Sequence, residues 1–256
     1  MNYGMQISAS GVLTSLYRMD VAANNLANVS TVGFKPDFAA IRQRDAERVE
    51  ARLSDVPANE LMERLGGGVF SMPTRTSIAQ GVLTATTNAL DLAIEGPGFF
   101  AVRDGSADGE VRLTRDGRLT RDANGRLVQA ASGLPVLDES GGAIVISQGS
   151  AITVDTSGTI RQNGQAIARL QLAQVENAGA LKKAGHGLFA VPEEALGGRA
   201  SGRIRQQMVE QSAVDAVRAL MAVTDAGRAA ESNMSMVQAH DRLADRAING
   251  LGRVSG

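Results

Sequence analysis

Apolar residues recur at helical spacing near the start of the chain. Met5, Val12, Met19 and Leu26 follow one another every seven residues. The position four residues after each of the first three is also apolar, and Leu16 is the largest of these. Such a stripe predicts an amphipathic helix of roughly 24 residues, about 36 Å long at about 1.5 Å per residue.

The pattern at the other end of the chain is longer. The spacing between apolar or small residues alternates between three and four, which is typical of a coiled-coil seam. Ser212 followed by Asp215 predicts the start, and the helix should run for about 38 residues, near 57 Å at about 1.5 Å per residue. The predicted seam comprises Ala213, Ala216, Leu220, Val223, Gly227, Ala230, Met234, Val237, Asp241, Ala244, Ile248 and Leu251.

The middle of the chain alternates apolar and polar residues in short runs such as EVRLTR, AITVD and IARLQLAQV. Turn pairs such as Asn124-Gly125 and Asn163-Gly164 separate them. This pattern predicts an antiparallel β-domain over residues 89–195. The segment 37–88 carries prolines, a charged run and the triplet Gly66-Gly67-Gly68, so we expect an extended connector there.

These elements predict an α+β fold in which paired N- and C-terminal helices bracket a central antiparallel β-domain. Residues 1–36 should form the first helix and its closing turn, and residues 205–256 the last helix. The last helix is longer than the first by about four turns of about 3.6 residues. A long helix gains little stability alone. We therefore expect a neighbouring copy or a homologous chain to cover the remainder.

Composition narrows the function classes. The formal net charge is −1, so no polyanion-binding face is indicated and nucleic acid is not expected as a partner. The chain contains no cysteine and only 2 histidines, and the histidines lack metal-ligand spacing. No apolar run is long enough to span a membrane, and no secretory signal peptide is visible. No cofactor, metal site or catalytic cluster is predicted.

The stretch that ends the first predicted helix resembles a known family signature. ANNLANVSTVGFK at residues 23–35 resembles the signature of the bacterial flagellar axial family, which contains the rod and hook subunits. LDLAIEGPGFFAV at 90–102 and LTRDGRLTRDANGRLV at 113–128 resemble the entry to that family's β-domain and the hairpin after it. VEQSAVDAVRALMAVTDAGRAAESN at 209–233 resembles its terminal helix. The chain departs from the family at Ala213, often Asn, and at Ala230, often Tyr.

The resemblance implies a structural role and not an enzyme. A length of about 250 residues suits a subunit of the basal-body rod, the tubular shaft that carries torque from motor to hook. The implied partners are copies of this chain, other rod and hook proteins, and the flagellar export apparatus. The rod spans the periplasm, and its subunits are exported unfolded without a cleaved signal peptide. Both proximal and distal rod positions remain open, although the long connector looks like the distal type.

The candidate assembly residues lie on the two helices and in the turn between residues 24 and 36. Asparagine, serine and threonine side chains in this turn are expected to satisfy backbone groups at the helix end. The alternatives are a hook-type subunit, a soluble β-domain enzyme with helical oligomerisation arms, and a closed coiled-coil oligomer. The full set of candidate assembly residues is Met5, Val12, Leu16, Met19, Asn24, Asn25, Leu26, Asn28, Phe34, Leu220, Val223, Gly227, Met234, Val237 and Ile248.

Overall fold

The computed structural model describes residues 3–45, 67–104, 109–149 and 151–252. Residues 46–66 of the expected connector lie outside this description. The side chains of Leu251 and its neighbours lie outside it as well. The chain forms two compact units. The helical unit comprises Met1–Leu26, Asp37–Arg75 and Asp215–Gly256, and the strand unit comprises Ala27–Pro36 and Thr76–Val214.

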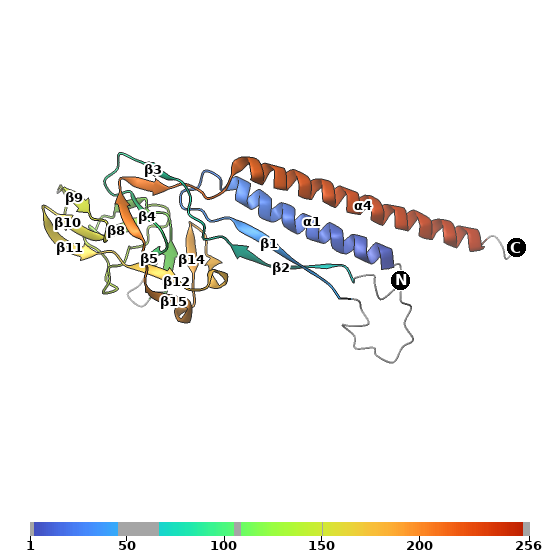
Figure 1. Ribbon diagram of the computed structural model, residues 1–256, viewed down its shortest axis with the longest axis horizontal. Helices are drawn as coiled ribbons and strands as arrows, with labels where there is room; N and C mark the ends of the chain where they lie inside the picture. Colours follow the sequence, from blue (N-terminus) through green and yellow to red (C-terminus); the bar gives the residue numbers. More distant parts are fainter. Residues whose placement is uncertain (1–2, 46–66, 105–108, 150, 253–256) are drawn as a thin grey trace. The chain divides into compact units, whose positions relative to one another are not determined.

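Among its described residues, the helical unit contains two long helices and a two-stranded ribbon. Helix α1 spans Tyr3–Ala27 and helix α4 spans Ala216–Gly252, with 25 and 37 residues. They pack side by side (Figure 1), which confirms the paired terminal helices. Strands β1 (Asp37–Gln43) and β2 (Val69–Thr76) pair with each other. The sequence indicated only an extended connector in this part of the chain.

The start of α4 differs from the prediction. The pair Ser212 and Asp215 indicated a capping box beginning at Ser212, but the first helical residue is Ala216. The Asp215 carboxylate accepts hydrogen bonds from the backbone N–H groups of Val217 and Arg218, both at 3.0 Å. Asp215 is therefore the N-cap, because its own side chain satisfies two of the free N–H groups of the first turn.

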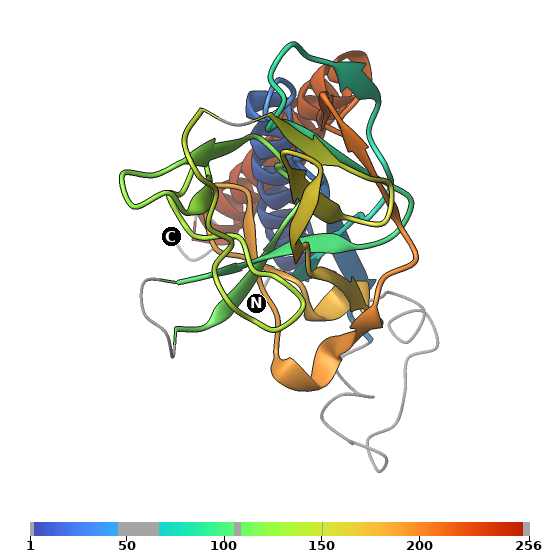
Figure 2. The same ribbon diagram turned by 90° about the vertical axis from the view of Figure 1, so that its left-hand side faces the viewer.

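The strand unit consists of short strands in several small sheets instead of one continuous layer (Figure 2). Its largest sheet has 6 strands in the order β13-β14-β6-β5-β12-β15, and every described pairing in it is antiparallel. The strands are β3 Leu83–Ala85, β4 Leu92–Glu95, β5 Phe99–Arg103, β6 Val111–Thr114, β7 Leu119–Arg121, β8 Leu127–Gln129, β9 Ile152–Val154, β10 Thr159–Gln162, β11 Gln165–Arg169, β12 Leu172–Val175, β13 Lys182–Lys183, β14 Leu188–Ala190, β15 Leu196–Arg199, β16 Arg203–Gln206 and β17 Met208–Glu210. Two 3₁₀ turns, η1 Ala178–Ala180 and η2 Glu193–Ala195, complete the unit.

Strand β5 explains why this unit has a real core. Successive side chains of a strand point to opposite faces. Phe100 and Val102 belong to one buried cluster, whereas Phe99 and Ala101 belong to another. The run FFAV is therefore apolar without alternation because both faces of β5 are covered. On the second face, the rings of Phe99 and Phe189 meet edge to face with centroids 5.7 Å apart.

One predicted hairpin illustrates how the turn pairs work. Strands β10 and β11 are joined by Asn163 and Gly164, with Gln162 paired to Gln165. Both loop residues have positive φ, 53° and 82°. An Asn-Gly pair tolerates that conformation, and it matches the twist of the flanking strands. This part of the antiparallel prediction is confirmed.

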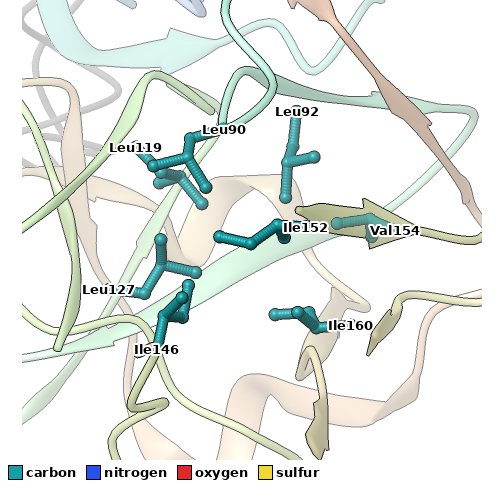
Figure 3. A pocket seen from close by; sticks show the side chains of 8 residues that line it. All are labelled: Leu90, Leu92, Leu119, Leu127, Ile146, Ile152, Val154 and Ile160. Carbon is teal, nitrogen blue, oxygen red and sulfur yellow. The ribbon is translucent and has the colours of Figure 1, made fainter. Parts of the chain in front are cut away.

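The core of the strand unit contains a small cavity (Figure 3). Its volume is about 10 Å³, and 8 aliphatic side chains line it. A space of this size is close to the minimum for one water molecule, but a buried water needs polar partners. The cavity therefore stays dry and is a packing defect, not a binding site. It is lined by Leu90, Leu92, Leu119, Leu127, Ile146, Ile152, Val154 and Ile160.

Candidate assembly surface

The face of α1 that meets α4 is built from small residues. A Cβ atom added at Gly4 would lie 2.5 Å from Cε1 of His240, and one added at Gly11 would lie 2.9 Å from Cγ of Asn233. Asn233 donates a hydrogen bond from Nδ2 to Oγ of Ser15 at 3.5 Å. The two helices thus approach closely, but the small side chains between them bury little apolar area.

Part of the matching face of α4 also consists of small residues, beside His240 and Asn233. Ala219 and Ala226 are buried, and Val223 is half-buried between them. A Cβ atom at Gly227 would lie 3.9 Å from Sδ of Met19. Two residues of the predicted seam, Val223 and Gly227, are therefore covered here, whereas the predicted Leu220 is exposed and its neighbour Ala219 is buried instead.

The ribbon of β1 and β2 is fixed to α1 by polar contacts. Asn25 donates from Nδ2 to the carbonyl of Asp37 at 2.7 Å and accepts from the Asp37 N–H at 2.9 Å. Tyr17 donates its hydroxyl to the carbonyl of Met72 at 2.7 Å, and Ser10 accepts from the N–H of Val69 at 3.3 Å. Asn25 therefore has an intramolecular role at the end of the helix, whatever else it contacts.

Large apolar side chains on both helices remain exposed. In α4, Leu220 is 56% exposed, Met234 44% and Ile248 70%. In α1, Leu13 is 69% and Leu16 39% exposed. Leu220, Met234 and Ile248 are spaced by multiples of seven, so they lie along one stripe of α4. Further exposed apolar side chains of α4 are Val217, Met221, Met236 and Leu243.

The end of α4 extends past the start of α1. Gly4 lies against His240, whereas Met19 lies near Gly227, so the helices are antiparallel. Residues 243–252 of α4 therefore continue beyond α1, over about 15 Å at about 1.5 Å per residue. Within the described residues of the helical unit, no second helix accompanies this segment.

The remaining candidate assembly residues are divided between the helical unit and the strand unit. Met5, Met19, Leu26, Val223, Gly227 and Val237 are half-buried, Val12 is buried and Asn24 is exposed, all in the helical unit. Asn28 and Phe34 belong to the strand unit. Asn28 accepts a hydrogen bond from the Thr31 hydroxyl at 3.1 Å, and the ammonium of Lys183 lies 4.0 Å from the centroid of the Phe34 ring.

A buried cluster of charges was not predicted from the sequence. Lys35 and Glu210, each 1% exposed, form an ion pair with Nζ and Oε1 2.5 Å apart. Arg115 donates from Nη1 to Oε2 of the same carboxylate at 3.0 Å. Lys35 also donates to the carbonyl of Ala79 at 2.6 Å, and Arg115 donates from Nη2 to that of Gly96 at 2.9 Å. Burial of the whole cluster strengthens the attraction between the charges relative to a surface ion pair, but it also costs desolvation free energy.

The charges in this cluster are unbalanced. Two cations share one carboxylate. Burial lowers the pKa of Lys35, because desolvation penalises its charged form. Glu210 opposes this shift through charge attraction and a hydrogen bond, and Arg115 adds to it by repulsion. Burial also lowers the pKa of the Arg115 guanidinium, again with Glu210 opposing.

The described residues contain neither of two kinds of functional feature, a metal-binding cluster and a membrane-spanning helix. Among them, no group of three or more His, Cys, Asp or Glu side chains is placed to hold a metal ion. No helix that the structure describes is both long and apolar enough to cross a membrane. The prominent features are thus an exposed apolar stripe and a buried charge cluster.

Comparison with known proteins identifies the family that this chain resembles. The family model described as "Flagella basal body rod protein" matches residues 5–35. "Flagellar hook protein FlgE/F/G D1 domain" matches residues 93–162, and "Flagellar basal body rod FlgEFG protein C-terminal" matches residues 205–250. A flagellar basal-body rod protein FlgF of Caulobacter vibrioides is 31% identical over 260 residues, covering 100% of both chains.

The chain belongs to the flagellar basal-body rod protein family. A FlgG of Caulobacter vibrioides is 30% identical over 93% of this chain and 95% of its own. A FlgG of Borreliella burgdorferi is 29% identical over 94% and 96%. This family is structural and non-enzymatic, so the alternative of a β-domain enzyme is set aside. Family membership also gives the chain a place in the basal-body rod, assembled with other rod proteins.

Proposed function

We propose that this rod subunit polymerises through the exposed apolar stripe of α4 and the exposed side of α1. The observation that carries the proposal is the exposure of Leu220, Met234 and Ile248 on a helix whose small residues are already used against α1. Contiguous exposed apolar side chains mark interaction sites. The occupant we infer is the helix pair of a neighbouring rod subunit, either a copy of this chain or a homologue.

Energetics favour that occupant. Fully burying a Leu, Ile or Met side chain is worth about 1.5–3 kcal/mol relative to leaving it in water, so the exposed stripe favours a neighbour that covers it. Seven-residue spacing suits knobs-into-holes packing against another helix. Such a contact joins different surfaces of successive subunits, and it builds a helical array when the rotation between them does not close into a ring.

The proposal includes a division of roles along the chain. Helices α1 and α4 of the terminal segments 1–36 and 205–256 would form the helical core. Residues 37–88 would connect, and the β-domain 89–195, with strands β16 and β17 of the last segment, would form the outer surface. In that arrangement, the rod spans the periplasm and transmits torque from the motor to the hook. Resemblance to the axial family further supports export through the flagellar apparatus without a cleaved signal peptide, with hook proteins and this apparatus as additional partners.

The test uses aspartate on the exposed stripe. In the variant Leu220→Asp/Ile248→Asp, both substitutions place a charge in the proposed interface but in solvent in the free subunit. We expect unchanged folding by circular dichroism, a stability change below about 1 kcal/mol, and loss of polymer formation measured by light scattering and electron microscopy.

A matched control is Val145→Asp, since Val145 is an exposed apolar residue of the strand unit, at 60%. This variant should polymerise like the wild type. Polymers formed equally well by the stripe variant would contradict the proposal, and a discrete particle of fixed mass in the wild type would favour a closed oligomer instead.

A further inference from the structure

The charge cluster of Lys35, Arg115 and Glu210 lies where distant segments of the strand unit meet. Lys35 is two residues before Asp37, where the chain enters the helical unit, and Glu210 is five residues before Asp215, where it does so for the last time. The Glu210 carboxylate also accepts a hydrogen bond from the N–H of Gly81 at 2.8 Å. One side chain thus joins segments that are up to 175 positions apart.

Backbone hydrogen bonds around the cluster align the same segments. The N–H of Gly33 donates to the Glu210 carbonyl at 2.7 Å, and the N–H of Ala213 donates to the Phe34 carbonyl at 3.1 Å. These two bonds set residues 33–34, which follow α1, against residues 210–213, which precede α4. The N–H of Gln211 donates to the carbonyl of Val82 at 2.8 Å. None of these three bonds involves a side chain of the cluster.

Burying a cluster of charges between these segments has a high desolvation cost. Removing three charges from water costs more than burying apolar side chains of similar volume, and replacing a buried ion pair by apolar residues is often neutral or stabilising. The excess cation adds to that cost. Apolar side chains, however, accept many alignments, whereas a carboxylate with Lys and Arg on separate oxygens accepts one. Buried charges of this kind are best attested as devices that specify register.

We propose that Lys35, Arg115 and Glu210 form a register lock, which fixes the segment leaving α1 against the segment entering α4 in a single alignment. The lock acts within the strand unit and goes beyond the proposed assembly through the helices, on which it does not depend. The segment that follows α1 and the segment that precedes α4 therefore have one fixed position relative to each other. A slip by one residue would place Lys35 or Glu210 without its partner in a buried site.

Amide hydrogen exchange on the full chain tests the lock. In Glu210→Gln, two buried cations lose their counter-charge, while the side-chain shape is kept. We expect the amides of Gly33, Gln211 and Ala213 to exchange together, on the order of a hundredfold faster than in the wild type. The amides of Ile146 and Leu170, bonded elsewhere in the unit to Gly125 and Gly158, should change less than about threefold.

The matched control is Glu95→Gln, which breaks an exposed ion pair with Arg205 at 2.8 Å and should leave all five amides unchanged. Unchanged exchange at Gly33 and Ala213 in Glu210→Gln would overturn the lock. Equal acceleration of Ile146 and Leu170 would also overturn it, because the cluster would then be an ordinary stabilising contact.

A second variant separates register from stability. In Lys35→Met/Arg115→Met/Glu210→Met, the cluster becomes apolar at similar volume. We expect its unfolding midpoint to recover above that of Glu210→Gln, while the amides of Gly33 and Ala213 stay fast. Wild-type protection of these two amides would overturn the proposal, since apolar packing would then suffice. Should this variant not fold, the comparison of Glu210→Gln with Glu95→Gln decides the question.

Discussion

In the strand unit, Phe100, Val102 and Val136 are completely buried, whereas in the helical unit Leu13, Leu220 and Ile248 are more than half exposed. The strand unit buries both faces of its central strand and so completes its own core. The helical unit joins its two helices largely through glycine, serine and alanine, together with His240 and Asn233 of α4. Large apolar residues are present in both units, but the helical unit buries few of them and leaves its largest ones exposed.

This difference separates two tasks. A unit with a complete core folds on the energy of its own packing. A helix pair whose contact consists largely of small residues buries less apolar area, and under our proposal its exposed large side chains meet a neighbouring subunit. Stability and assembly should therefore respond to different substitutions, and the predictions below probe that separation, from the largest expected effect to the smallest.

The largest effect is expected for Phe100→Ala in β5. Phe100 is fully buried, and removing such a ring costs about 3–5 kcal/mol through lost transfer energy and the cavity left behind. Denaturant unfolding followed by circular dichroism measures this cost. Leu220→Ala is the counterpart in the helical unit and should change stability by less than about 0.5 kcal/mol. Similar losses for both variants would erase the distinction between the two units.

Gly33→Ala should have the next largest effect. Gly33 has φ of +69°, and a Cβ atom there would lie 2.6 Å from the carbonyl carbon of Arg115. Left-handed strain alone costs about 1–2 kcal/mol, and the clash with backbone adds to it. Gly133→Ala is the matched control, because its φ is +72° but nothing lies within 4 Å. Thermal unfolding should show a clearly larger loss at Gly33, and equal losses would mean that the turn can relax.

Filling the cavity in the strand unit should give a small gain. Val154→Ile adds one methylene beside the dry space shown in Figure 3. A buried methylene is worth at most about 0.8 kcal/mol. Calorimetry should therefore show a slightly raised unfolding temperature. A lowered temperature would indicate that the surrounding side chains are already close-packed.

The smallest effect concerns pH. The Ser157 hydroxyl and the N–H groups of Ser157 and Thr159 donate to the Asp155 carboxylate, and they hold its pKa below its ordinary value of 3.8. A depressed folded-state pKa contributes stability above pH 3.8, which is lost as pH falls through the lower, folded-state value. Asp155→Asn should therefore flatten the acid side of the stability profile measured by urea unfolding. A steeper loss in the variant than in the wild type would contradict this assignment.

Local patterns predicted the elements well, because helix periodicity and turn pairs act within a few residues. The lengths of both helices and the Asn163-Gly164 hairpin followed from them. The pairing of β1 with β2 had no such signal. The start of α4 was misplaced because Ser212 and Asp215 are both good caps, and only tertiary context selects Asp215.

The charge cluster shows why the rest could not be predicted. The tetrapeptide LTRD occurs at 113–116 and again at 119–122. Arg115 of the first copy is buried against Glu210, whereas Arg121 of the second is partly exposed. Identical local sequence thus leads to opposite environments, since the partner of Arg115 lies 95 positions away. The same limit applies to Leu220, whose exposure depends on which neighbouring residue of α4 faces α1.

The most direct test of the separation between stability and assembly is the alkylation of single introduced cysteines. It is possible because the chain contains no cysteine of its own. Single cysteines at Leu220 and Ile248 are alkylated in the purified subunit and in isolated basal bodies that carry the same variant. Ala226→Cys, at a buried site of α4, gives a slow reference in both states. We expect fast reaction at positions 220 and 248 in the free subunit and rates near the reference after assembly. Fast reaction at both positions in basal bodies would contradict the account, because the exposed stripe would then have no partner in the rod.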